Sequence, residues 1–303
     1  RTAEHVRAYI KVQDGCNQFC TYCIIPYARG RVRSRKKENI LKEVHKLADA
    51  GYKEVVLTGI HLSSYGVDFQ EDEKETLLSL IQAVNEVEGI RRIRLGSLEP
   101  GIVTEEFARE LASMPKICPH FHLSLQSGCD ATLERMNRRY RSAEYKEKCE
   151  ILRKYFGNPA LTTDVIVGFP MENEEDFEKS YEFVKDIHFY ETHIFKYSRR
   201  HGTKAAAMEG QLTEAVKAIR SDKMLELHQK RATEYETSLQ GHIMEVLLEE
   251  EAELEGNQYY IGHSCEYVKV AVPVQEKYQV NDILTVKAKG FLQPHILLGE
   301  EYL

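Results

Sequence analysis

The sequence lacks the features that would place the protein in a membrane or outside the cell. No run of about eighteen apolar residues occurs among its 303 residues, so we expect no membrane partner. No signal peptide opens the chain, which begins at Arg1, and we expect a fragment of a longer cytoplasmic protein. The seven cysteines are an odd number, which favours a reducing compartment over a disulfide framework.

The chain also lacks the excess of positive charge that is typical of nucleic-acid-binding proteins. Its net charge is −7, and residues 241–303 account for all of it with four lysines and eleven acidic residues. The remainder of the chain sums to about zero. Any surface that binds nucleic acid must therefore be local.

Three cysteines lie close together with no fourth nearby. Cys16, Cys20 and Cys23 have the spacing C-x3-C-x2-C, and the flanking Gly15 and Pro26 favour a loop around a metal centre. A structural zinc site needs four ligands, and an iron–sulfur cluster normally takes four thiolates. Three thiolates on a four-iron cluster leave one iron open for a non-protein ligand, as a reactive cluster requires. A zinc knuckle with a distant fourth ligand, or chance spacing, is the alternative.

The hydrophobic pattern predicts an α/β fold with six successive strand-then-helix units. Such a repeat indicates a parallel sheet with helices outside it, and six units suggest an incomplete (β/α)6 barrel of the TIM type. Chemistry in such barrels takes place at the carboxyl ends of the strands. The expected strands are 8–13, 54–59, 92–98, 120–126, 161–167 and 190–197. The expected helices are 38–50, about 74–88, one from Thr104 to before Pro115, 142–156, 173–187 and about 213–238.

The pattern changes after the last of these helices. Short β-like runs without intervening helices predict a small all-β barrel, so we divide the chain into domains at 1–238 and 239–303. We interpret the acidic run from Glu249 to Glu255 as a solvated hairpin loop.

The cysteine motif after a short strand resembles the signature of the radical S-adenosylmethionine (SAM) enzymes. The longer string GCNQFCTYCIIPYARGRVRSR resembles the methylthiotransferase branch, and KVQDGC with LTGIHLSSYG is most similar to the tRNA threonylcarbamoyladenosine methylthiotransferases. The resemblance runs from about Ala8 to the C-terminus. It implies a radical SAM partial barrel, a 4Fe-4S cluster on the three cysteines, bound SAM, and a TRAM-like domain at the C-terminal end.

The resemblance also implies an activity. A 5′-deoxyadenosyl radical formed from SAM would activate C2 of threonylcarbamoyladenosine beside the tRNA anticodon, where a methylthio group is installed. The electron donor would be a flavodoxin or a ferredoxin. Relatives carry an N-terminal domain whose three cysteines hold a second, auxiliary 4Fe-4S cluster, and no such domain precedes Ala8. We therefore expect this chain to cleave SAM but to complete little methylthio transfer.

The candidate SAM-binding residues lie at the ends of successive strands. We expect Glu99, near a barrel mouth, to hydrogen-bond SAM or substrate, with a salt bridge to a nearby arginine as the alternative. Arg200 is a candidate for binding a carboxylate of SAM or of substrate. By resemblance, the others bind the methionine amino group, the ribose or the adenine. The full set is Gly59, His61, Ser97, Glu99, Gln126, Ile166 and Arg200.

Two positions depart from the family pattern. His61 stands where the superfamily often has glutamate in a GGE motif. Met171 stands where the family usually has the glycine of GFPGE, and a glycine there could adopt a positive φ, which methionine resists.

Four arginines alternate after the cysteine loop. If the stretch is extended, Arg29, Arg31, Arg33 and Arg35 point to one face and could bind an RNA backbone. The alternative is a solvated edge or salt bridges between domains.

Three other functions remain open from the sequence. They are a methylthiotransferase that acts on a ribosomal protein, a different radical SAM RNA-modifying enzyme, and a zinc-bearing RNA-binding module without catalysis.

Overall fold

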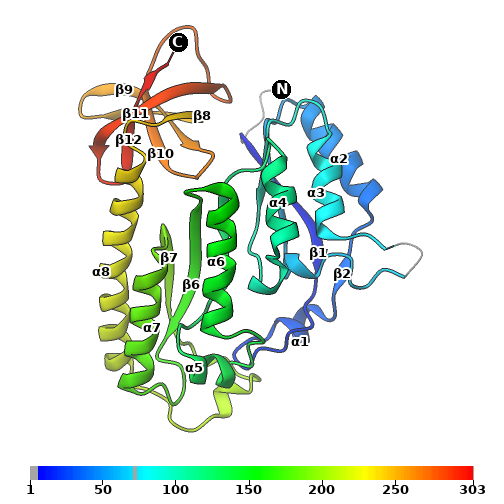
Figure 1. The fold of residues 1–303 in the computed structure, drawn as a ribbon, viewed down its shortest axis with the longest axis vertical. Helices are drawn as coiled ribbons and strands as arrows, with labels where there is room; N and C mark the ends of the chain where they lie inside the picture. The colour runs from blue at the N-terminus through cyan, green and yellow to red at the C-terminus, as the bar shows by residue number, and fades with distance from the viewer. Residues whose placement is uncertain (1–5, 71–73, 303) are drawn as a thin grey trace.

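A computed structural model describes residues 6–70 and 74–302 of the chain (Figure 1). Six parallel strands form the wall of an incomplete barrel, in the spatial order in which they occur in the sequence. The first three and the last three belong to separate sheets, which a parallel bridge between Leu98 and Leu123 joins. The six strands are β1 (Arg7–Asp14), β3 (Glu54–Gly59), β4 (Arg92–Leu95), β5 (His120–His122), β6 (Ala160–Val167) and β7 (Glu191–Lys196). The predicted partial barrel is confirmed.

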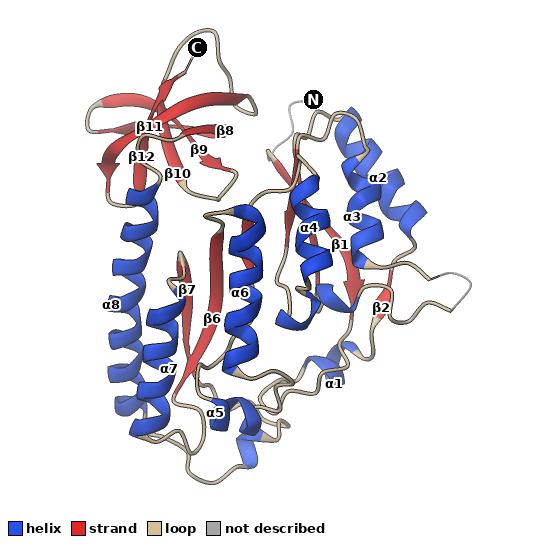
Figure 2. Cartoon of the chain, viewed as in Figure 1, coloured by secondary structure: helices blue, strands red, loops and turns tan. Residues whose placement is uncertain are grey.

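The helices pack on the outside of this wall (Figure 2). Thr104, Asn173 and Thr213 each begin a helix by accepting a backbone N–H hydrogen bond on the side-chain oxygen. None of the helices in the described ranges is long and apolar enough to cross a membrane. The longer helices are α2 (Lys37–Asp49), α3 (Leu77–Asn85), α4 (Glu105–Ser113), α6 (Ser142–Phe156), α7 (Glu174–Ile187) and α8 (Glu214–Ser238); α1 (Ile25–Arg29) and α5 (Asp130–Arg135) are short.

Residue alternation along the strands separates the helix-facing side of the wall from its inner side. In β1, Ala8, Ile10 and Val12 are buried in the main hydrophobic core, whereas the intervening Tyr9 and Lys11 are exposed. The apolar set therefore packs under the helices, and the opposite side of the strand is left for polar or exposed side chains.

The C-terminal region is a closed barrel of five strands, with the order β10-β12-β11-β8-β9. The interpretation of the acidic run Glu249 to Glu255 as a hairpin loop is wrong. β8 extends to Leu254, and only Glu255 of this run lies in the turn after it. The final strand was not expected from the sequence. The strands are β8 (Ile243–Leu254), β9 (Asn257–Ser264), β10 (Lys269–Pro273), β11 (Ile283–Gln293) and β12 (Ile296–Glu301).

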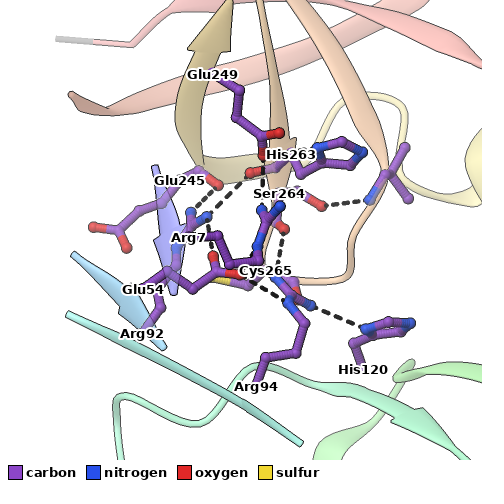
Figure 3. A network of polar contacts seen from close by, with 11 residues as sticks. Arg7, Glu54, Arg92, Arg94, His120, Glu245, Glu249, His263, Ser264 and Cys265 are labelled. Atoms are coloured by element: carbon purple, nitrogen blue, oxygen red, sulfur yellow. Dashed lines mark hydrogen bonds and ion pairs between the residues drawn. The ribbon is translucent and has the colours of Figure 1, made fainter. Parts of the chain in front are cut away.

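The small barrel lies at the end of the sheet where the parallel strands begin, opposite the loop that leads to α1 (Figure 1). Arginines of β4 bind its backbone carbonyls. Arg92 donates to the carbonyls of Glu245 at 2.6 Å and His263 at 3.0 Å, and Arg94 donates to that of Cys265 at 2.8 Å. These contacts attach the small barrel to the end of the large barrel at which the parallel strands begin, which we call its floor (Figure 3).

One buried carboxylate, that of Glu54, contacts all three arginines at this floor. Glu54 is fully buried, and its oxygens contact Arg7, Arg94 at 3.0 Å and Arg92 at 3.6 Å. Arg7 also donates to Glu249 of β8 at 2.7 Å. The network therefore links both parts of the chain (Figure 3).

Met171 adopts the positive φ that the sequence pattern suggested for its position, with φ of +64°. Its side chain is largely exposed, and its N–H donates to the carbonyl of Gly210 at 2.8 Å. We expect Met171→Gly to stabilise the fold by up to ~1 kcal/mol, because relief of the left-handed backbone strain outweighs the added freedom of the unfolded chain. Denaturant unfolding measures the change, and Met171→Ala, which keeps a Cβ, is the control that gains nothing.

Candidate metal and cofactor site

The three clustered cysteines lie in one loop between β1 and α1, as the sequence predicts. All three are free of disulfide bonds; Cys16 and Cys20 are buried and Cys23 is partly buried. Burial raises the pKa of both Cys16 and Cys23 above that of an ordinary thiol. Thiolate ligation would therefore release protons when metal binds.

Close backbone approach fixes the start of this loop. Gly15 has φ of +72°, and a Cβ there would lie 2.0 Å from the carbonyl oxygen of Arg31. The N–H of Cys16 donates to the carbonyl of Gly30 at 3.1 Å. Only glycine fits at position 15, because the backbone at Gly30 and Arg31 passes so close to it.

The middle of the loop is held by segments far away in the sequence. The N–H of Thr21 donates to the carbonyl of Met136 at 3.0 Å, and its hydroxyl donates to that of Arg135 at 2.8 Å. The carbonyl of Thr21 accepts from the N–H of Ala205 at 2.8 Å. The cysteines are thus placed against the segments that follow α5 and β7.

Arg138 connects the cysteine loop to the end of the third parallel strand. Its Nη1 donates to the sulfur of Cys20 at 3.1 Å, its Nη2 lies 3.5 Å from Glu99 Oε1, and its Nε donates to the Tyr140 hydroxyl at 3.0 Å. The arginine side chain is only 8% exposed. A buried cation beside a sulfur ligand is well placed to compensate thiolate charge.

Glu99 has protein partners for both of its carboxylate oxygens. Its Oε2 lies 2.6 Å from His61 Nε2, and Arg138 faces its Oε1. Burial alone would raise the pKa of Glu99, but the hydrogen bond with His61 and the charge of Arg138 outweigh it and lower the pKa. Glu99 therefore has an arginine partner, Arg138, and Ser97 is exposed on the same loop.

The close approach at Gly59 is to a side chain of β1. A Cβ at position 59 would lie 2.7 Å from Gln13 Oε1, which also accepts the N–H of His61 at 2.9 Å. The Nε2 of Gln13 donates to the carbonyl of Gly15 at 2.7 Å. Gln13 thus couples the end of β3 to the cysteine loop.

Four of the predicted residues line one cavity at the carboxyl ends of β6 and β7. Cys23, Gln126, Ile166 and Arg200 face this space of about 270 Å³. Gln126 has φ of +73°, and its backbone bonds to Asp164 and Ile166 hold it at the edge of the wall. The other lining residues are Tyr22, Asp164, Phe195, Lys196, Tyr197 and Ser198.

The four alternating arginines do not form one extended row. Arg29 ends the helix α1 that begins before Pro26, and only Arg33 lies in a strand, the two-residue β2 (Arg33–Ser34), which pairs antiparallel with β1. Proline favours the first turn of a helix, which explains the break. Arg29, Arg31 and Arg33 are exposed, with Arg33 3.6 Å from Asp14, and Arg35 pairs with Glu43 at 2.6 Å.

Sequence reasoning missed Arg138 and Gln13. Gln13 ends an expected strand but was not singled out, and Arg138 lies outside the expected strand ends; their contacts with His61 and Cys20 join segments distant in sequence. The sequence could not indicate which arginine of the loop doublet Arg138-Arg139 contacts the cysteines. The two residues are identical in type, and only the structure shows that Arg138 donates to Cys20.

The residues present fit a cluster with three protein ligands. They offer three free thiols in one loop, an arginine directed at one sulfur, and an adjoining cavity. Within residues 6–70 and 74–302, the His, Cys, Asp and Glu side chains close enough together to hold a single ion are His122, Asp164 and His193, not these cysteines. The zinc-knuckle alternative gains no fourth ligand from this arrangement.

Known proteins resemble this chain in sequence and in fold. Residues 10–184 match the model of the Radical SAM superfamily. Among solved structures, methylornithine synthase superposes with a TM-score of 0.52 at 13% identity, covering 75% of this chain and 62% of that one, which supports the fold.

Curated relatives are more similar still. The threonylcarbamoyladenosine tRNA methylthiotransferase MtaB of Bacillus subtilis is 41% identical over 94% of this chain, which spans 62% of that protein. The MtaB of Chlamydia pneumoniae is 40% identical, with 97% of this chain and 68% of the relative covered. The tRNA-2-methylthio-N(6)-dimethylallyladenosine synthase of Thermoanaerobacter sp. is 42% identical, with 81% and 52% covered. The chain therefore belongs to the radical SAM superfamily and, within it, to the family of tRNA methylthiotransferases.

Proposed function

We propose that this chain is the SAM-cleaving part of an enzyme that installs a methylthio group on C2 of threonylcarbamoyladenosine in tRNA. The observation that carries the proposal is the shared position of Cys23, Gln126, Ile166 and Arg200 around one cavity beside the cysteine loop. The match to the B. subtilis relative over 94% of the chain supports the choice of nucleoside.

In this proposal Cys16, Cys20 and Cys23 hold a 4Fe-4S cluster, and the cavity receives SAM. When bound, the two cofactors supply one-electron cleavage of SAM and thereby a radical. The protein's own residues orient them. Arg138 stabilises the Cys20 thiolate by a charge-assisted hydrogen bond, and Gly15 permits the tight return of the loop.

The cavity offers suitable partners for the parts of SAM. Gln126 brings an amide to the ribose, and Ile166 offers an apolar surface to the adenine. Arg200 supplies a cation for a carboxylate. Gly59 and His61 contact Gln13, and Glu99 contacts Arg138; we assign Ser97 to the SAM site on the resemblance alone. We assign Glu99 and His61 to positioning, because each already pairs with the other.

We further propose that tRNA lies against the exposed Arg29, Arg31 and Arg33. The C-terminal barrel, taken as a domain from 239 to 303 after a SAM domain of 1–238, resembles a TRAM domain. Its negative charge favours a shape-based over a phosphate-based contact with RNA. A substrate of this kind also indicates a cytoplasmic protein with a small electron-transfer donor, such as a flavodoxin or a ferredoxin.

A second candidate substrate is dimethylallyladenosine in tRNA, because a relative named for that product is 42% identical over 81% of the chain. The test is anaerobic reconstitution with iron and sulfide, followed by reduction with dithionite. We expect 5′-deoxyadenosine and methionine from SAM. Comparing the rate of SAM cleavage in the presence of tRNAs carrying each modification then identifies the substrate. A reconstituted protein that leaves SAM intact would refute the proposal.

Removing Arg138, the arginine beside Cys20, is expected to change the reduction potential of the proposed cluster. We expect Arg138→Leu to lower its midpoint potential by tens of millivolts, because a cation and an N–H hydrogen bond to sulfur both favour the reduced state. Anaerobic redox titration measures the shift. Arg139→Leu, at the exposed neighbouring position, is the matched control and leaves the potential unchanged. Equal shifts of the potential in both variants would show that the loss of any nearby positive charge, and not the contact of Arg138 with Cys20, causes the change.

A further inference from the structure

Three side chains on neighbouring strands form a second group of potential metal ligands, which the proposed function does not use. His122 of β5, Asp164 of β6 and His193 of β7 place one ligand atom each within 4.8 Å of the other two. The sheet register produces this grouping, because Asp164 pairs directly with His193, and Thr162, two residues before Asp164, pairs with His122. All three therefore stand on the same side of the sheet.

The distances in the group suit a single ion. Asp164 Oδ2 lies 3.3 Å from His122 Nε2, and Asp164 Oδ1 lies 3.1 Å from His193 Nδ1. With metal–ligand distances of roughly 2.0–2.1 Å, neighbouring ligand atoms of a tetrahedral site are about 3.3–3.4 Å apart. The two contacts of Asp164, one from each carboxylate oxygen, are thus close to the spacing of neighbouring ligand atoms in such a site.

Each histidine has its other ring nitrogen beside an orienting group. The Nδ1 of His122 lies 2.9 Å from the Thr162 hydroxyl, and the Nε2 of His193 lies 3.8 Å from a carboxylate oxygen of Glu191. Metal-binding histidines almost always have such a partner on the distal nitrogen, since it fixes the ring orientation.

One atom of the group is left without a hydrogen bond. The Nε2 of His122 is buried and, among the described residues, has no hydrogen-bond partner, although it faces the Asp164 carboxylate. A buried polar atom without a partner is costly, and a metal ion at this point would satisfy it.

We propose that His122, Asp164 and His193 bind one divalent transition-metal ion. Two imidazoles and one carboxylate suit zinc, iron(II) or manganese(II) better than magnesium or calcium. His193 is 51% exposed, so the site is open and leaves coordination positions for water or for an oxygen or nitrogen donor of a bound molecule. Asp164 also lines the cavity, so the proposed ion would lie beside it.

The test separates this site from the cysteine loop. The Cys16→Ala/Cys20→Ala/Cys23→Ala variant is dialysed against Zn²⁺, and the retained metal is measured. In parallel, Zn²⁺ binding is measured on the anaerobically reconstituted wild-type protein. We expect one zinc ion per chain in the triple variant, and Co²⁺ in its place should give visible d–d bands without a sulfur-to-cobalt charge-transfer band.

Substitutions within the triple variant identify the ligands. We expect His193→Gln and Asp164→Asn each to weaken zinc binding at least about 100-fold, and Glu191→Gln to weaken it about 10-fold to 100-fold. His45→Gln, at an exposed position on α2, is the matched control and leaves binding unchanged. Circular dichroism and thermal melting establish that each variant is folded before its affinity is compared.

Three results would overturn the proposal. They are no retained zinc, a cobalt spectrum with sulfur ligation, and unchanged affinity in a folded His193→Gln or Asp164→Asn variant. The first would leave the group as contacts of Asp164 with His122 and His193 only. Because metal retention is measured without SAM or tRNA, the result does not depend on whether the proposed function is correct.

Discussion

Replacing Cys20 by alanine is expected to abolish both cluster loading and SAM cleavage. Three protein thiolates are the minimum that leaves one open iron, so the variant retains too few ligands for a stable cluster. After anaerobic reconstitution we expect iron content to fall from about four per chain to near zero. The production of 5′-deoxyadenosine falls to background. Iron and sulfide analysis with a SAM-cleavage assay measures both effects.

A second cysteine substitution separates ligand loss from a general loss of thiols. Cys149 is fully buried in α6, in the main hydrophobic core and outside the cysteine loop. We expect Cys149→Ala to cost some stability but to keep the iron content of the wild-type protein. If Cys20→Ala still cleaved SAM, the assignment of the three cysteines to a cluster would be wrong.

The second large effect is expected at Glu54, whose carboxylate faces three arginines at the floor of the barrel. Glu54→Gln removes the only anion that contacts Arg92 and Arg94 among the described ion pairs. Because this leaves buried cations uncompensated, we expect a loss of about 3–5 kcal/mol in the free energy of unfolding. Guanidinium unfolding measures it.

A matched exposed pair provides the control. Glu43 pairs with Arg35 at 2.6 Å, but both side chains are substantially exposed. Glu43→Gln is therefore expected to cost less than about 1 kcal/mol. Similar losses in the two variants would show that burial does not determine the strength of the Glu54 network.

The same carboxylate gives a defined dependence on pH. Burial by itself would raise the pKa of Glu54, but Arg94 and Arg7 outweigh it and lower the pKa from 4.5 to about 2. A lowered pKa in the folded state means that the stabilisation is complete above pH 4.5 and is lost as the pH falls through about 2. The stability difference between wild type and Glu54→Gln is therefore expected to narrow over this interval, as unfolding curves at several pH values would show. A constant difference would contradict this origin.

The sequence alone determined the features that depend on local spacing. The C-x3-C-x2-C motif predicted the cysteine loop, and the hydrophobic pattern predicted all six parallel strands. Thr104 predicted where one helix begins, and the structure shows it as the N-cap of α4. These features could be predicted because a period of two or 3.6 residues and an N-cap act over a few neighbouring positions.

Only the tertiary structure decided which distant groups meet. Arg138 reaches Cys20 across 118 residues of sequence, and Arg7 reaches Glu249 across 242. The tertiary structure also places Glu249 in β8, where the sequence indicated a loop. Both carboxylate oxygens of Glu99 face protein partners, His61 and Arg138. Such contacts follow from the closure of the barrel and the docking of the small one, which bring together side chains with no shared local pattern. The physical reason is that a buried charge takes whichever partner the packed chain supplies, irrespective of separation along the sequence.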